Sequence, residues 1–303
     1  MSRLGGHSRG AGARTQSEDP CAGAARPWAK EELLWLRVLK SPHEHLRRCD
    51  WAFLEERLAR SRPEIRRKLI ELGLIEYGRR YEVDETFFDS WSPATAWVLG
   101  LLLSDGHLPR TAPAIHFSST DRELVEKVRS CLRSTHPIKQ TDGGVGHRGS
   151  RPVFVLTIVR RRLRTAVDRL VPGRLKSERV RLPDVPLECL GHLVRGYFEG
   201  DGSIYFDEPR SNLHVQISGL TAFIEDLRVR LAIAGVADGG FVYRCPQARD
   251  TSTLHINGAM AFRLADYLYR DVPDALVLTR KRAVYLRCRE WRARRGLLDE
   301  ARG

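Results

Sequence analysis

Two aspartates stand at equivalent places in two similar segments of the chain, and their side chains could bind metal ions. Asp105 lies in WVLGLLLSDGHL (97–108), and Asp201 lies 96 residues further on, in LVRGYFEGDGSI (193–204). Carboxylate oxygens are hard ligands that suit Mg²⁺, which completes its shell with water and phosphate oxygens. Two carboxylates held side by side would attract divalent cations. Such ions support phosphodiester hydrolysis by activating water and stabilising the leaving oxygen.

The segments that precede these aspartates are predicted to form two paired helices. Residues 97–103 are apolar almost all round, which is typical of a helix buried on every side. Gly100 and Gly196 are also 96 residues apart and would lie in mid-helix, where glycine costs about 1 kcal/mol relative to alanine. We expect close packing of the two helices to compensate, so that Asp105 and Asp201 meet at the helix C-termini on a pseudo-twofold axis.

The likeness between the two segments continues downstream, so the chain contains an internal repeat. Strand-like segments at 114–119 and 214–219 are each followed by an amphipathic helix, at 121–132 and 220–235. Two more strands and a closing helix complete each copy: PIKQ, PVFVLTI and 160–170 in the first, and FVYRC, STLHI and 259–271 in the second. The order α-β-β-α-β-β-α predicts an α+β fold in which each copy supplies a four-stranded antiparallel sheet.

Three short helices are predicted before the repeats, at 30–40, 50–59 and 62–74. Pro63 suits a first helical turn and Gly73 a helix end. Three helices with a tight turn before the last are typical of a helix-turn-helix, and the stretch resembles Myb-like or resolvase-like trihelical modules, with Ala59 where glycine often opens the turn. We expect its basic residues to contact DNA, and the alternative is a three-helix cap with a solvated basic face. These residues are Arg66, Arg67 and Lys68.

The domain organisation follows from these elements and from composition. Residues 1–27 are rich in Gly, Ala, Ser and Arg and contain no aromatic residue, so a disordered tail is expected. The predicted order is a tail at 1–27, a helix-turn-helix module at 28–75, a connector at 76–90, a first repeat at 91–171, a linker at 172–184, and a second repeat with a basic C-terminal helix at 185–295.

The paired motifs resemble those of single-chain LAGLIDADG homing endonucleases, over residues 88–290. The resemblance implies a saddle of two antiparallel sheets and an enzyme that hydrolyses both strands of a long DNA site across the minor groove, with Mg²⁺ or Mn²⁺. It implies that Asp105 and Asp201 are metal-binding catalytic residues. Family members also carry an active-site lysine late in each copy, which corresponds here to Lys176 and Lys281. A polar water-positioning residue often ends the second strand, where Gly219 has no side chain to offer.

Polar faces of the two predicted sheets are candidates for base recognition in the major groove. Strand alternation places apolar residues on one face and polar residues on the other; the alternative is a merely solvated face. The candidate DNA-binding residues are His116, His214, Gln216, Thr253 and His255. The formal net charge of +13, with a pI near 9.9, favours a polyanionic partner.

Other classes of protein are disfavoured by simple features. No apolar run approaches the roughly 20 residues needed to span a bilayer, the N-terminus lacks the apolar segment of a secretory signal, and the six cysteines form no CxxC pair of a zinc ribbon. We therefore expect an intracellular, cytoplasmic, nucleoid-associated monomer that binds double-stranded DNA. Two alternatives stay open: a non-cleaving DNA-binding regulator on the same scaffold, and an intron-encoded maturase that binds RNA.

Overall fold

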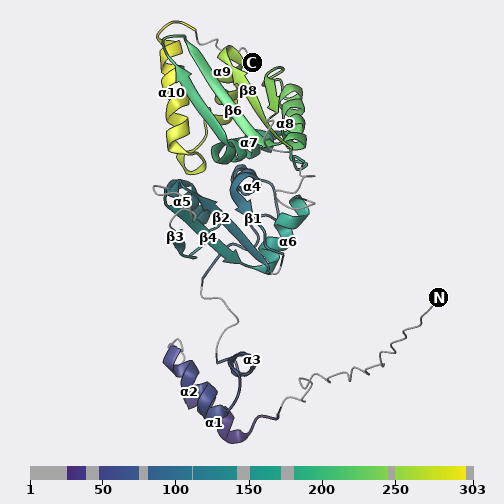
Figure 1. Cartoon of the computed structure of the whole chain (residues 1–303), viewed down its shortest axis with the longest axis vertical. Helices are drawn as coiled ribbons and strands as arrows, with labels where there is room; N and C mark the ends of the chain where they lie inside the picture. The colour runs from purple at the N-terminus through teal and green to yellow at the C-terminus, as the bar shows by residue number, and fades with distance from the viewer. Residues whose placement is uncertain are drawn as a thin grey trace, which may run out of the picture. The chain divides into compact units, whose positions relative to one another are not determined.

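The computed structural model describes residues 26–38, 48–74, 81–110, 112–141, 151–171, 181–244 and 250–297. The chain divides into two compact units, residues 1–79 and 80–303 (Figure 1). Most of the expected tail at 1–27, most of the linker at 172–184 and Lys176 within it lie outside the described residues. No helix in the described parts is long and apolar enough to cross a membrane.

Within residues 26–38 and 48–74, the first unit contains three helices close to the positions that the sequence predicts. They are α1 (Lys30–Val38), α2 (Arg48–Leu58) and α3 (Arg62–Glu71). Apolar side chains at helical spacing meet in a small core of Leu36, Leu54, Leu58, Ile65 and Leu69. Three partly buried tryptophans, at positions 28, 35 and 51, pack against this core and increase the apolar area that it buries.

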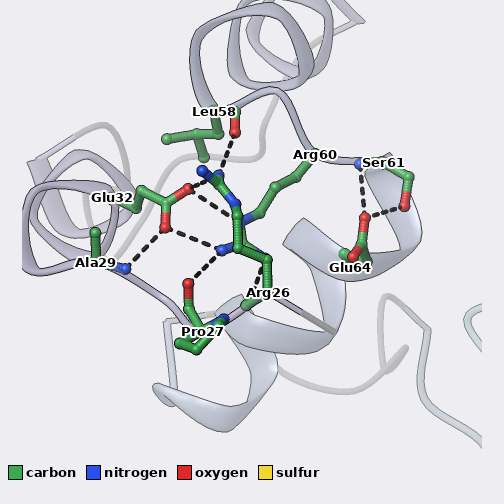
Figure 2. Close-up of polar contacts among 8 residues, drawn as sticks. All are labelled: Arg26, Pro27, Ala29, Glu32, Leu58, Arg60, Ser61 and Glu64. Carbon is green, nitrogen blue, oxygen red and sulfur yellow. Dashed lines mark hydrogen bonds and ion pairs between the residues drawn. The ribbon is translucent and has the colours of Figure 1, made fainter. Parts of the chain in front are cut away.

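A buried ion pair joins α1 to the turn between α2 and α3 (Figure 2). Arg60 is 6% exposed and donates to both carboxylate oxygens of Glu32, with N–O distances of 3.0 Å. Its guanidinium also donates to the carbonyls of Arg26 and Pro27 and lies 4.0 Å from the ring centroid of Trp28. The hydrogen bonds from Arg60 lower the pKa of Glu32 to about 2. A charge pair with this many partners fixes the path of the chain before α1 and after α2.

The turn between α2 and α3 contains a backbone conformation that glycine favours. Ala59 has a φ of +48°, in the left-handed region. Two residues later, Ser61 is the N-cap of α3, and both its backbone N–H and its hydroxyl donate to Glu64 (2.9 and 2.7 Å; Figure 2). The carboxylate of Glu64 thus satisfies a donor at the helix start, which lacks a partner within the helix.

The second unit is built from two copies of the predicted α-β-β-α-β-β-α order. The first copy comprises α4 (Pro93–Asp105), β1 (Gly106–His107), β2 (Ala114–Ser119), α5 (Arg122–Cys131), β3 (Ile138–Thr141), β4 (Val153–Val159) and α6 (Arg161–Leu170). Its strands form an antiparallel sheet in the order β1-β2-β4-β3.

The second copy has the same arrangement and continues into the C-terminal helix. It comprises α7 (Leu187–Asp201), β5 (Gly202–Asp207), β6 (Asn212–Leu220), α8 (Thr221–Ile233), β7 (Phe241–Arg244), β8 (Thr251–Asn257) and α9 (Gly258–Tyr269), followed by a short 3₁₀ turn (Asp274–Leu276) and α10 (Thr279–Ala293). The sheet order is β5-β6-β8-β7. The predicted α+β fold with two four-stranded antiparallel sheets is therefore confirmed.

One core runs through both copies, and α4 and α7 lie side by side between the two sheets (Figure 1). Strand alternation sends apolar side chains into this core, as Val215 and Ile217 of β6 show, because successive residues of a strand point to opposite faces. The intervening His214 and Gln216 lie on the opposite, solvent-accessible face. Each sheet therefore keeps one polar face uncovered by its own helices.

Candidate active site

The pairing of α4 and α7 depends on a glycine in each helix. A Cβ added at Gly100 would lie 2.1 Å from the carbonyl oxygen of Leu193, and one added at Gly196 would lie 2.0 Å from that of Trp97. Both distances are far shorter than any real contact of a Cβ atom, so the two backbones touch at this crossing. The helices can run this close only because neither position carries a side chain.

Asp105 and Asp201 are the last residues of these two helices and lie on the same pocket. The pocket has a volume of about 300 Å³. Its lining comprises Leu103, Ser104, Asp105, Tyr197, Asp201, Gly219, Leu220, Phe223 and Thr251. A Cβ added at Gly200 would lie 2.9 Å from Asp105 Oδ2, so the first aspartate lies against the backbone next to the second. The tertiary structure thus brings the two predicted metal ligands together.

The pocket contains two carboxylates, and three hydroxyl-bearing residues, Ser104, Tyr197 and Thr251, also line it. No third His, Cys, Asp or Glu joins the two aspartates in a metal-binding cluster within the part of the chain that the structure describes. Mg²⁺ usually takes one or two protein carboxylates and keeps several waters. The residues present therefore fit a hydrated divalent cation that also contacts a phosphate.

Lys281 has a different environment from the one expected of an active-site lysine. It is 3% exposed, and its Nζ donates to the carbonyls of Phe198, Glu199 and Gly202 at 2.6, 3.0 and 2.5 Å. These carbonyls lie at the C-terminal end of α7, where helix carbonyls lack partners within the helix. Burial lowers the pKa of Lys281 to about 8. The amine thus holds the helix end that carries Asp201, and all three of its donors are used there.

Glu199 is a buried acid that sequence reasoning left without a role. It is 1% exposed and accepts hydrogen bonds from Trp97 Nε1 and from the backbone N–H of Leu278, both at 2.7 Å. It therefore connects α7 to α4 and to the start of α10. Burial raises its pKa to about 7. The sequence contains one indication of this role: the second motif has Glu199 at the place where the first motif has the apolar Leu103.

Arg195 is a second buried charge that the sequence analysis missed. Its Nε donates to the Leu276 carbonyl at 2.8 Å, and its Nη1 donates to the Leu268 carbonyl at 3.1 Å. Burial lowers its pKa to about 10, and the charge of Glu199 opposes that shift. The indication in the sequence was an arginine in mid-helix, directly after Leu193 and Val194 and before Gly196. It anchors α7 to the segment that leads into α10.

The candidate base-reading residues lie on the uncovered sheet faces and are linked in pairs across strands. His116 Nδ1 lies 2.9 Å from Thr157 Oγ1, and His214 Nδ1 lies 2.8 Å from Asn257 Oδ1. Ser218 and Thr253 share a hydroxyl hydrogen bond of 2.9 Å. On the second sheet, Gln216 pairs with His255 in the β6–β8 register. These pairs pre-orient side chains on a surface that also exposes three aromatic residues: Tyr205, Phe241 and Tyr243.

The three basic candidates on α3 belong to the other unit and differ in accessibility. Arg66 and Arg67 are exposed. Lys68 has a side chain that is 15% exposed, and its Nζ donates to Glu71 at 2.7 Å. Arg66 and Arg67 are therefore better placed than Lys68 to contact a ligand.

Comparison with known proteins identifies a domain family in the first copy. Residues 92–171 match the LAGLIDADG-like domain family. A curated relative, elongation factor 2 of Methanopyrus kandleri, is 34% identical over 96 residues, which make up 29% of this chain and 7% of that protein. The chain therefore spans only a small part of that relative's length.

Solved structures with a similar arrangement have low sequence identity to this chain. The homing endonuclease I-WcaI bound to its DNA recognition sequence is 9% identical and matches 70% of this chain and 96% of its own, with a TM-score of 0.46. Full-length DUF199/WhiA from Thermatoga maritima is 11% identical and matches 72% and 67%, with a TM-score of 0.44. I-DmoI in complex with DNA and Mn is 14% identical and matches 59% and 98%, with a TM-score of 0.39.

Proposed function

We propose that this protein is a site-specific endonuclease that cuts both strands of double-stranded DNA. The observation that carries the proposal is the position of Asp105 and Asp201, which end two backbone-contacting helices and line one pocket together with residues of β6, α8 and β8. One acidic residue from each half of a pseudo-twofold unit matches the symmetry of the two DNA strands. The match of residues 92–171 to the LAGLIDADG-like domain family supports the same proposal.

In this proposal Asp105 and Asp201 hold Mg²⁺ or Mn²⁺ through their carboxylate oxygens. When bound, such an ion supplies an activated water and stabilises the leaving oxygen of the phosphodiester. The protein keeps the two carboxylates in place: Gly100 and Gly196 allow the helices to touch, and Lys281 holds the C-terminal end of α7. A chain with both halves of the site needs no second subunit, so we propose that it acts as a monomer.

The target in this proposal is a long DNA site that both sheets contact. Polar residues on the uncovered faces, such as His116, Gln216 and His255, offer donors and acceptors for base edges in the major groove, with cleavage across the adjoining minor groove. The net charge of +13 favours the DNA backbone as a partner. We place the protein in the cytoplasm with the nucleoid, where such a target is found.

The first unit supplies, in this proposal, a second DNA contact through α3. Its exposed Arg66 and Arg67 follow a tight turn and a capped helix start. Short basic helices of this kind bind phosphates or enter a groove. The contact would lengthen the target site beyond the part covered by the two sheets.

A second candidate function is sequence-specific DNA binding without cleavage. It is favoured by one observation: among the described residues, none that lines the aspartate pocket is a lysine or an arginine. The amine of Lys281 is used by three backbone carbonyls instead of facing a phosphate. In this second candidate, the two sheets and α3 bind double-stranded DNA and the aspartate pocket does not hydrolyse it.

The test is a cleavage and binding screen on a randomised or genomic DNA library with Mg²⁺ or Mn²⁺. The wild-type protein is expected to produce double-strand breaks at one long site. D105N and D201N, which keep the side-chain size, are expected to bind that site with similar affinity and to lose double-strand cleavage. Specific binding without cleavage by the wild type would establish the second candidate. Full cleavage by either variant would overturn the assignment of the two aspartates.

A further inference from the structure

Gly219, which adjoins the aspartate pocket, differs from its counterpart in the first copy. The sheet registers Gly106–Phe117 and Gly202–Ile217 align the copies, so that Ser119 of β2 corresponds to Gly219 of β6. Gly219 lines the pocket, and the second copy therefore has no side chain at this place. At the corresponding position the first copy has Ser119, whose hydroxyl accepts a hydrogen bond from the backbone N–H of Asp121.

The hydroxyl of Tyr197 fills the space that a side chain at position 219 would use. A Cβ added at Gly219 would lie 2.2 Å from Tyr197 Oη, so a side chain at position 219 would force the tyrosine to shift. Tyr197 follows Gly196 in α7, and the corresponding residue of the first copy is Leu101, which has no polar atom. The tyrosine and the glycine are therefore matched to each other in the second copy.

Tyr197 is held in one orientation and lies on the pocket. It is 5% exposed, its Oη donates to the Ser218 carbonyl at 2.9 Å, and its ring packs on that of Phe223 with centroids 4.3 Å apart. Burial raises the pKa of this phenol, and the charges of Asp201 and Asp105 raise it further. The group therefore stays protonated. Since the Tyr197 O–H donates its hydrogen bond to the Ser218 carbonyl, the phenol oxygen can accept a hydrogen bond from a water in the pocket.

We propose that Tyr197 is a positioning residue that replaces, in the second copy, the polar side chain missing at Gly219. Its Oη accepts a hydrogen bond from a water beside Asp105 and Asp201 and orients that water toward one of the two scissile phosphates. The first copy uses no tyrosine at this place, so the two strands are served by different groups. This inference rests on the proposed endonuclease function.

The experiment measures the cleavage of each strand separately, on the target found in the library screen, with a different end label on each strand. Tyr197→Phe removes one oxygen and keeps the ring. One strand is expected to be cut about tenfold or more slowly, because a misplaced reacting group is costly, while the other keeps its rate and a nicked intermediate accumulates. The control is Tyr267→Phe, which removes a phenol oxygen from α9, outside the residues that line this pocket.

A rescue variant separates positioning from folding. With Oη removed, the next atoms near a Cβ at position 219 are Tyr197 Cζ at 3.3 Å and Ile224 Cδ1 at 3.4 Å, tight contacts that a shift of a few tenths of an ångström in these side chains would relieve. Adding Gly219→Ser to the Tyr197→Phe variant is therefore expected to bring the cleavage rates of the two strands back toward their wild-type ratio. Gly219→Ser alone is expected to lower the melting temperature, because its Cβ meets Tyr197 Oη.

The outcomes distinguish this inference from the function on which it rests. If the wild type cuts and Tyr197→Phe cuts both strands at the wild-type rates, the inference is wrong and the endonuclease proposal stands. Equal slowing of both strands without rescue by Gly219→Ser would also overturn it, because it would indicate a structural role alone. A wild-type protein that cuts no DNA would overturn both.

Discussion

Gly100 and Gly196 meet where α4 crosses α7: a Cβ added at Gly100 would lie 3.0 Å from the Cα of Gly196 and 2.1 Å from the Leu193 carbonyl oxygen. Alanine favours a helix over glycine by about 1 kcal/mol, yet Gly100→Ala and Gly196→Ala are expected to destabilise the second unit. The obstacle in each case is backbone, which cannot turn away as a side chain can. We expect a loss of about 3 kcal/mol or more, at or above the upper end of overpacking penalties, measured by urea unfolding.

Gly191→Ala is the matched control for these substitutions. Gly191 lies in the same helix α7, but an added Cβ there would meet the ring of Tyr267, at 3.0 Å from Cζ. A side chain can shift, so the loss is expected to be much smaller. Equal stability of the wild type and of both the Gly100 and Gly196 variants would contradict the backbone contact.

Lys281→Met is expected to destabilise the second unit while keeping most of the apolar stem of the side chain. The substitution removes three hydrogen bonds to the carbonyls at the end of α7. Buried carbonyls that lose their donors cost about 1–3 kcal/mol. The exposed Lys139→Met is the control and is expected to leave the unfolding midpoint unchanged. If Lys281→Met lowered only the rate of cleavage and not stability, the amine would act in catalysis, as the resemblance to the family implies.

Ala59→Gly is expected to stabilise the first unit. Ala59 has a φ of +48°, and non-glycine residues in this region carry strain on the order of 1 kcal/mol. The gain is partly offset by the larger freedom of glycine in the unfolded chain. Ala52→Gly, at an exposed position within α2, is expected to have the opposite effect. Amide hydrogen exchange of residues 48–74 would measure the stability change in each variant. A loss of protection in Ala59→Gly would contradict the claim that Ala59 is strained.

The ion pair between Glu32 and Arg60 is expected to make the first unit sensitive to acid. The pKa of Glu32 is lowered from its ordinary value of 4.5 to about 2, so its contribution to stability is fully present above pH 4.5 and is lost as the pH falls toward 2. Hydrogen exchange of residues 48–74, corrected for the intrinsic rate, should show this loss. Glu32→Gln should be less stable near neutral pH and should lose this dependence, whereas Glu71→Gln should keep it. An unchanged pH profile in Glu32→Gln would contradict the assignment.

Arg66→Ala combined with Arg67→Ala is expected to weaken DNA binding and to make it less dependent on salt. Each phosphate contact contributes about 0.9 to the slope of log K against log salt. Two lost contacts would therefore lower the slope by about 1.8, with strand cleavage intact at low salt. Lys68→Ala is the comparison, since Lys68 is paired with Glu71 and is expected to change the slope less. Identical slopes for the double variant and the wild type would favour the three-helix cap.

Periodic patterns in the sequence were enough to predict the architecture of the second unit. The spacing of 96 residues between Gly100 and Gly196, and between Asp105 and Asp201, revealed the repeat, and the alternation at 214–217 assigned the faces of β6. Helix and strand periods are local, because they arise from the backbone geometry of a few neighbouring residues. The same patterns therefore located the ends of α4 and α7 and the residues found there.

The roles of single side chains in the site depended on contacts that no local pattern contains. Lys281 was expected to line the active site, and in the structure its amine donates to carbonyls of residues about 80 positions earlier in the chain. Glu199 reaches Trp97 in the other copy, and Tyr197 occupies the space beside Gly219. The sequence determined which elements form and which residues end them. The tertiary structure decided where the buried polar groups find partners, because each one must satisfy its hydrogen bonds with whichever distant backbone or side chain the packing brings within reach.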